Sequence, residues 1–153
     1  MTVRILSLVA CAKTKKPSAC EARHLYSPSV LFRLAFQLSE RCANAVLILS
    51  ALHGIVRPTQ IIEPYEQLLV GRSLRERQKW AEDAFNSLKE MKEYHDSEVV
   101  LFFAGQAYRD QLLRMISGDG KRCLIPMAGL ALGQQVAWLN RNKAITVEEL
   151  LKC

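Results

Sequence analysis

Several side chains that can do chemistry lie close together in the segment 50–66, which reads SALHGIVRPTQIIEPYE. His53 titrates near neutral pH and can donate a hydrogen bond to an anion. The ring of Tyr65 can stack on a nucleobase, and the proline after Glu63 keeps that carboxylate in an extended segment. Gly54 allows the positive φ angle that a sharp turn requires. This combination favours one wall of a nucleotide-sized pocket.

A second polar segment follows the first apolar run and reads CAKTKK at 11–16. Lys and Thr side chains in such a loop can contact phosphate groups without reading the sequence of a nucleic acid. The phosphate-binding loop of nucleotide hydrolases needs glycines so that backbone amides can wrap the oxygens, and no glycine precedes Lys13. The sequence therefore excludes that class of ATPase and predicts phosphate contacts through side chains.

The composition is typical of a globular domain with an excess of positive charge. The 153 residues favour a single domain, 1–153, and the net charge of +6 favours anionic partners such as nucleic acid or a nucleotide. The apolar runs are far shorter than the roughly 20 residues that cross a bilayer. We therefore expect a cytoplasmic protein without membrane contact and assume a monomer.

The cysteines form an odd set of five without a C-x-x-C pair, which argues against a disulfide framework. Cys11, Cys20 and His24 do not have the spacing of a common zinc site and lack a fourth ligand. We expect reduced thiols, no metal site and no cofactor.

Four apolar segments rich in β-branched residues predict strands at 3–10, 45–50, 98–104 and 121–126. Their nearly continuous apolar character favours a parallel sheet that is covered on both faces. Helical patterns lie between and after them, which predicts a three-layer α/β fold with a four-stranded parallel sheet.

Capping residues indicate where the helices begin. The first helix is predicted to start at an N-cap Ser27 followed by Pro28, and the second at a capping box of Ser73 and Glu76, with an apolar stripe from Leu74 to Met91. Further helices are predicted after GQAY at 105–108, over LGQQVAWLNR at 132–141, and behind the N-cap Thr146. In open α/β sheets ligands bind beyond the carboxyl ends of the strands. The loops that begin at 11, 50, 105 and 126 should therefore meet at one site.

Two motifs resemble known families. The segments ACAKTK and LSALHGIVRPTQIIEPYEQLL resemble the signatures of the YaaA family of peroxide stress proteins. The chain is also similar to a family of small bacterial and phage domains, through Cys11 to Lys15, Leu25-Tyr26, Ala51 to Ile55 and Leu132 to Leu139. These resemblances imply a fold related to the uracil-DNA-glycosylase superfamily, with strand order 2-1-3-4, and action on nucleic acid, preferably DNA.

The implied activity is a DNA glycosylase that excises a damaged or modified base, in repair or in anti-phage defence. Such a reaction needs an anion near the developing sugar cation and donors near the leaving base. The expected catalytic residues are Glu63 and Glu66, as water-activating carboxylates, and His53. Expected substrate-binding residues are Cys11, Lys13, Thr14, Lys15, Ser50, Gly54, Arg57, Tyr65, Gly105, Gln106, Tyr108 and Gln134.

Two alternatives stay open. In the first, the same loops form the pocket of a non-catalytic protein that binds DNA or senses a modified nucleotide, and the carboxylates pair with Arg57 or Arg23. In the second, the protein hydrolyses free nucleotides.

Overall fold

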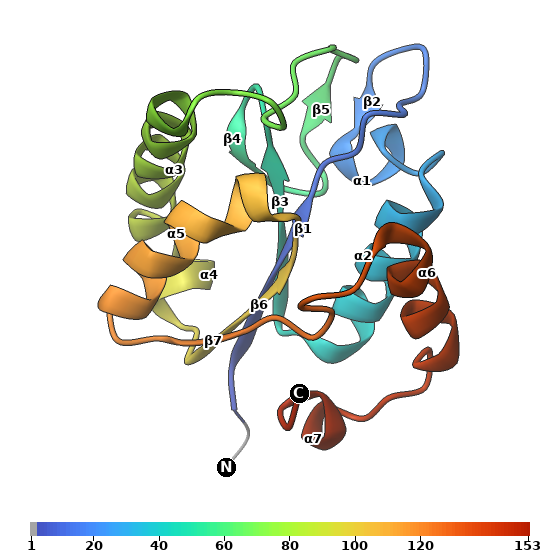
Figure 1. Cartoon of the computed structure of the whole chain (residues 1–153), viewed down its shortest axis with the longest axis vertical. Coiled ribbons are helices and arrows are strands. Elements are labelled where there is room, and N and C mark those ends of the chain that lie inside the picture. Colours follow the sequence, from blue (N-terminus) through green and yellow to red (C-terminus); the bar gives the residue numbers. More distant parts are fainter. Residues whose placement is uncertain (1–2) are drawn as a thin grey trace.

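The computed structural model describes residues 3–153 and contains a central five-stranded sheet with helices on both faces (Figure 1). The strand order is β4-β3-β1-β6-β7, in which β1, β3, β6 and β7 are parallel and β4 is antiparallel to β3. A separate pair, β2 and β5, forms a small antiparallel sheet. The bounds are β1 (Ile5–Ala10), β2 (Cys20–Glu21), α1 (Ala22–Leu25), α2 (Val30–Cys42), β3 (Ala45–Ser50), β4 (Gly54–Val56), β5 (Ile61–Ile62), α3 (Leu74–Lys89), α4 (Lys92–His95), β6 (Val99–Phe103), α5 (Gln106–Gly118), β7 (Arg122–Leu124), α6 (Leu132–Arg141) and α7 (Val147–Leu150).

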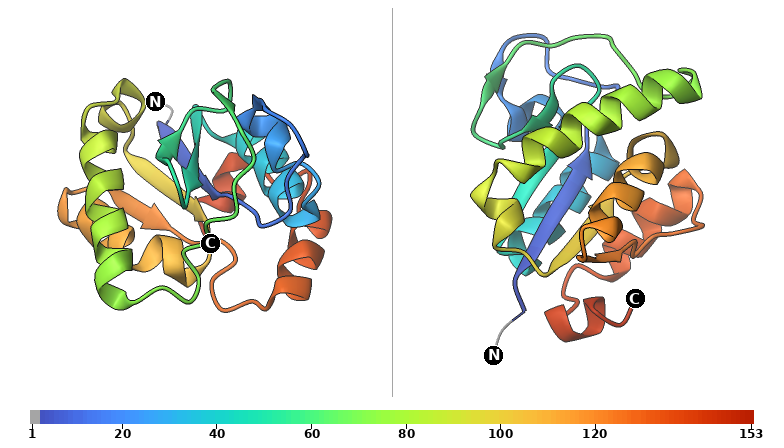
Figure 2. Two further views of the ribbon diagram at one scale, coloured as in Figure 1. Left: turned by 90° about the horizontal axis from the view of Figure 1, so that it is seen from above. Right: turned by 90° about the vertical axis from the view of Figure 1, so that its left-hand side faces the viewer.

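The central strand β1 is apolar on both faces because each face supports its own core. Ile5 and Val9 point into a cluster with residues of α1, α2, α6 and α7. Leu6 and Leu8 point into a second cluster, with residues of α3, α4 and α5. Alternate residues of a strand face opposite sides, so one run of apolar residues can build both cores. Figure 2 shows these two groups of helices on opposite sides of the sheet.

The mixed α/β architecture with helices on both faces agrees with the sequence prediction, but the sheet has five strands rather than four. The additional strand, β4, follows β3 after a tight turn in which Gly54 has φ 73°. Three residues are too few to show a period of alternation, which is why the sequence patterns missed it.

The capping residues of α3 and α7 were predicted correctly. Both hydrogen bonds of the Ser73–Glu76 capping box are present at α3, and Thr146 caps α7. The prediction for α2 was wrong, since Ser29 rather than Ser27 accepts the hydrogen bond from the Phe32 amide and Pro28 lies before the helix.

The apolar stripe of α3 differs at its beginning from the prediction. Leu74 is exposed, whereas Trp80 is buried and donates from Nε1 to the Ser50 carbonyl at 2.9 Å. Within residues 3–153, no helix has the length and apolar character needed to cross a membrane.

Candidate functional site

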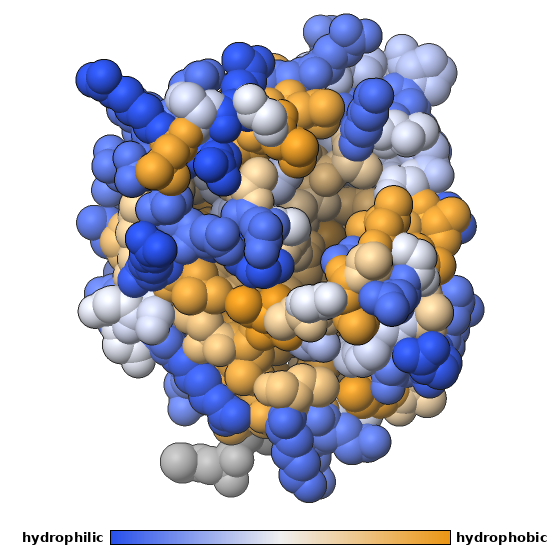
Figure 3. Space-filling view, in the orientation of Figure 1, coloured by the Kyte–Doolittle hydropathy of each residue, from blue (hydrophilic) through white to orange (hydrophobic). Residues whose placement is uncertain are grey.

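A cleft of about 550 Å³ opens at the carboxyl ends of β1 and β6, which are neighbours in the sheet. The chain leaves β1 toward the face that carries α2 and leaves β6 toward the face that carries α5. This divergence of two adjacent parallel strands is where open α/β sheets form their binding crevice. Figure 2 (left) looks onto this end, and Figure 3 shows an apolar hollow between α5 and α6 with hydrophilic side chains around it.

The lining of the cleft combines apolar and polar side chains. Phe32, Phe102 and Met127 belong to the apolar lining, which also includes parts of segments 9–14 and 102–109. The polar lining consists of Lys13, Thr14, Ser29, Gln106, Tyr108, Arg109 and Gln135. A ligand with an apolar part and an anionic group fits this lining.

Arg109 is the cation that the protein fixes most firmly in the cleft. Its side chain is only 16% exposed, Nη1 donates to the Ala104 carbonyl at 3.1 Å, and Nε lies 3.7 Å from Asp110 Oδ1. The N-cap of α5 is Gly105, which provides no side-chain cap, and both Gly105 and Gln106 also line the cleft. Lys13 on the opposite segment adds a second positive charge.

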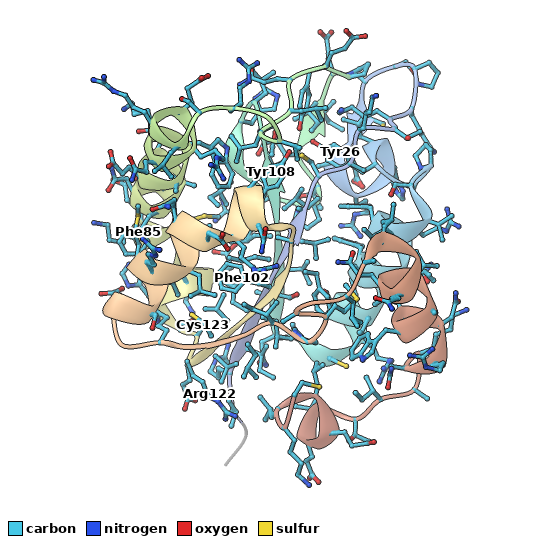
Figure 4. The ribbon with its side chains drawn as sticks, in the orientation of Figure 1. Tyr26, Phe85, Phe102, Tyr108, Arg122 and Cys123 are labelled. Atoms are coloured by element: carbon cyan, nitrogen blue, oxygen red, sulfur yellow. The ribbon has the colours of Figure 1, made fainter. Side chains whose placement is uncertain are left out.

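Cys11 and Tyr108 connect the two strand ends at the cleft. The Cys11 thiol donates to the Tyr108 hydroxyl at 3.4 Å, and Tyr108 is almost fully buried. Burial raises the pKa of Tyr108 above its ordinary value, so the phenol stays protonated. Figure 4 shows Tyr108 and Tyr26 at the same end of β1, while Arg122 lies toward the other end of the molecule.

A buried chain of hydroxyl groups lies beside the cleft. The Tyr65 hydroxyl is 2.7 Å from both the Tyr26 hydroxyl and Ser50 Oγ, and Ser50 Oγ also accepts from the His53 amide at 3.0 Å. Burial raises the pKa of Tyr26 to about 12 and also raises the pKa of Tyr65, so both phenols stay neutral. The His53 ring packs edge-on against Tyr65, with 5.6 Å between centroids.

The ammonium of Lys15 lies on this aromatic group rather than in the cleft. Lys15 Nζ is 4.5 Å from the Tyr65 ring centroid and 5.9 Å from that of Tyr26. Burial lowers the pKa of Lys15, and the nearby Cys11 and Glu66 offset this only in part.

The structure brings part of the predicted set together. Cys11, Lys13, Thr14, Gly105, Gln106 and Tyr108 line the cleft. The adjoining group consists of Lys15, Ser50, His53, Gly54 and Tyr65, in which Lys15 lies over the Tyr65 ring and His53 packs edge-on against it.

Four predicted residues lie elsewhere. Arg57 forms a bidentate ion pair with Glu93, at 3.0 and 3.1 Å, on the outside of the sheet. Gln134 accepts from the Ala131 amide and serves as a helix cap, while its neighbour Gln135 lines the cleft. Glu63 and Glu66 are exposed, and within residues 3–153 no Asp or Glu lines the cleft.

Sequence reasoning missed Arg109, Gln135 and Ser29 as cleft residues. Arg109 directly follows GQAY, so the rule that ligands bind at strand ends would have found it if applied one residue further. Gln134 and Gln135 are neighbours in sequence, and only the rotation of the helix about its axis shows which of the two side chains faces the cleft.

In the described part of the chain, no group of at least three His, Cys, Asp or Glu is arranged to hold a metal ion, and all five cysteines are free.

Residues 6–141 match the DUF6884 family, which is described as a family of unknown function. The chain belongs to this family. The match begins in β1 and ends with α6, so the DUF6884 region contains every segment that lines the cleft. No curated protein and no solved structure matches the chain.

Proposed function

We propose that the cleft binds one nucleotide unit of a nucleic-acid strand, preferably DNA, with the base in the apolar interior and the phosphate beside Arg109 and Lys13. The observation that carries this proposal is the cleft itself, whose apolar interior adjoins a fixed guanidinium. Its volume of about 550 Å³ lies within the range of sites that hold small ligands.

The charges around the cleft support an anionic ligand. Arg109 keeps guanidinium N–H groups that the Ala104 carbonyl does not use, and a guanidinium binds phosphate oxygens in pairs. Lys13 and Thr14 face the same cavity from the end of β1. Gln106 and Gln135 can hydrogen-bond the edge of a base.

A second proposal is N-glycosidic bond cleavage, as in a DNA glycosylase of repair or anti-phage defence. Its support is the motif resemblance, which also carries our proposal of kinship with the uracil-DNA-glycosylase superfamily and the YaaA proteins. Glu66 lies on the segment that contributes Leu68 and Val70 to the cleft. A shift of this segment on binding would be needed to bring Glu63 or Glu66 to the sugar.

Binding is tested with a fluorescein-labelled single-stranded oligodeoxynucleotide, by fluorescence anisotropy. We expect Arg109→Gln to weaken binding about tenfold, because a hydrogen bond to a charged group is worth about 1.5 kcal/mol or more. Arg114→Gln is the matched control, since Arg114 is an exposed residue of the same helix and does not line the cleft. Equal losses in both variants would mean that only net charge matters, and would contradict the proposed site. An unlabelled nucleoside monophosphate that competes as well as the oligonucleotide would point to a free nucleotide as ligand.

Cleavage is tested by incubating the protein with oligonucleotides that carry modified bases and detecting released base and alkali-labile strand breaks. If a substrate is found, the double variant Glu63→Gln, Glu66→Gln should abolish release while oligonucleotide binding persists. Release at the wild-type rate would exclude both carboxylates, and binding without release from any substrate would favour the non-catalytic alternative.

A further inference from the structure

Tyr65 contacts three separate segments at the edge of the cleft. Its hydroxyl bonds to Ser50 at the end of β3 and to Tyr26 after α1, each at 2.7 Å. Lys15 Nζ lies over its ring, 4.5 Å from the ring centroid. The hydroxyl and the ring therefore hold different parts of the chain, and a substitution can remove one contact without the other.

The hydroxyl fixes the segment that follows Tyr65. Residues 66–72, which we call the strap, have no helix or strand and supply Leu68 and Val70 to the cleft lining. Leu69 points inward and is only 3% exposed. The strap ends at the capped beginning of α3, and the hydroxyl bonds of Tyr65 lie just before its other end, where Gln67 Nε2 also donates to the Ala51 carbonyl at 3.3 Å.

The ring fixes the segment that contains Lys13. Lys15 Nζ donates to the Lys13 carbonyl at 3.2 Å while it lies on the Tyr65 ring. The Lys16 amide donates to the Leu25 carbonyl at 2.8 Å. Residues 13–16, which we call the lysine loop, are thereby held with Lys13 and Thr14 at the cleft.

We propose that Tyr65 is a positioning residue that holds two walls of the cleft, the strap through its hydroxyl and the lysine loop through its ring. The effect on ligand binding rests on the proposed function, whereas the positioning of the two segments does not. Tyr65 itself does not line the cleft, so it acts through Leu68, Val70 and Lys13.

The test uses variants that separate the two contacts. Tyr65→Phe removes both hydroxyl bonds and keeps the ring. Ser50→Ala removes one of these bonds and also the acceptor of the His53 amide. Lys15→Met removes the ammonium and keeps most of the stem. Ser39→Ala is the matched control, because the Ser7–Ser39 hydroxyl pair is also buried and 2.7 Å long but lies outside the cleft lining.

Hydrogen exchange of the free protein, followed by mass spectrometry, measures each wall without any ligand. We expect Tyr65→Phe to speed exchange in the strap roughly five- to tenfold, with a smaller effect of Ser50→Ala, while the lysine loop keeps its wild-type rate. Lys15→Met should speed exchange in the lysine loop alone, about two- to fivefold. Ser39→Ala should lower the melting temperature and leave both segments unchanged.

The labelled oligonucleotide then measures the consequence for binding. Tyr65→Phe and Lys15→Met should each weaken binding about fivefold or more, and Ser39→Ala should have no effect. Unchanged exchange in the strap of Tyr65→Phe, or equal changes in Tyr65→Phe and Ser39→Ala, would overturn the inference. So would altered exchange with wild-type affinity. If the wild-type protein does not bind the oligonucleotide, the proposed function fails, and the exchange results alone decide whether Tyr65 holds these segments.

Discussion

At the scale of single residues, the cleft holds polar side chains in place through hydrogen bonds to the protein itself. The Arg109 guanidinium donates to the Ala104 carbonyl, and the Gln135 amide donates to the Leu130 carbonyl at 3.0 Å. Each group keeps unused hydrogen-bonding capacity, because a guanidinium has five donors and a side-chain amide has two donors and an acceptor. Groups that are fixed in this way lose less conformational freedom when a ligand binds.

The position of Cys11 gives a direct measure of cleft occupancy. Saturating oligonucleotide should slow the alkylation of Cys11 by iodoacetamide, because the thiol lines the cleft. Cys20 is the internal control, since it is also half-buried but lies outside the lining, and its rate should not change. Peptide mass spectrometry reports both rates. Equal protection of the two thiols would indicate a global effect and not occupancy of the cleft.

The Arg57–Glu93 pair should stabilise the fold in a pH-dependent way and have no role in binding. Burial acts to raise the pKa of Glu93, but the hydrogen bonds from Arg57, a backbone hydrogen bond and the charges of Arg57 and Lys92 together outweigh it and hold that pKa below its usual value. Because the folded-state pKa is depressed, the stabilisation is present above the unfolded-state pKa and is lost as pH falls through the folded-state pKa.

We therefore expect Arg57→Gln to lower the free energy of unfolding by about 0.5 kcal/mol at pH 7, a small value because the guanidinium is half exposed. The difference from wild type should shrink toward zero at a pH below the folded-state pKa of Glu93, where the carboxyl is protonated in both states. Urea unfolding at the two pH values measures this. The same loss at both would show that the pair acts through packing and not through charge.

At the scale of secondary-structure elements, α3 begins where the strap ends, so its cap affects both stability and the cleft edge. Ser73→Ala removes the side chain that accepts from the Glu76 amide at 3.1 Å. We expect a loss of about 1 kcal/mol in the free energy of unfolding, measured by urea denaturation. Thr146→Ala breaks the equivalent box of α7, a four-residue helix near the C-terminus, and should cost less because that helix can fray alone. A larger loss for Thr146→Ala would contradict this ranking.

The elements could be predicted from sequence where local chemistry specifies them, as at Ser73 and Thr146 or in the apolar run 45–50, which is β3 to the residue. The strand-end rule also placed Cys11, Lys13 and Tyr108 at one cleft. The hydroxyl chain could not be predicted, because Tyr26 and Tyr65 are 39 positions apart and no local pattern places their hydroxyl groups together. The contacts of the Tyr65 ring with Lys15 and His53 could not be predicted for the same reason, since both partners come from other segments.

At the scale of the whole molecule, binding through the overall net charge of +6 and binding through the few cations of the cleft should differ in their dependence on salt concentration. If Lys13 and Arg109 each contact one phosphate, log K for a single-stranded oligonucleotide should fall with log salt concentration with a slope of about −1.4. Lys13→Gln should reduce the slope by about 0.7. Anisotropy titrations across a salt series give these values. A much steeper slope, unchanged in the variant, would show that charge across the surface dominates binding.

The pairing of β1 with both β3 and β6 has a consequence for the order of folding events. Leu6 pairs with Ala45, whereas Ile5 pairs with Val99, so the second contact closes a far longer loop. Contacts between distant positions form slowly because the chain loses more entropy to make them. The cleft needs both 9–14 and 102–109, so it exists only after the slower pairing is complete. A refolding chain should therefore regain its helical circular-dichroism signal before it regains oligonucleotide binding.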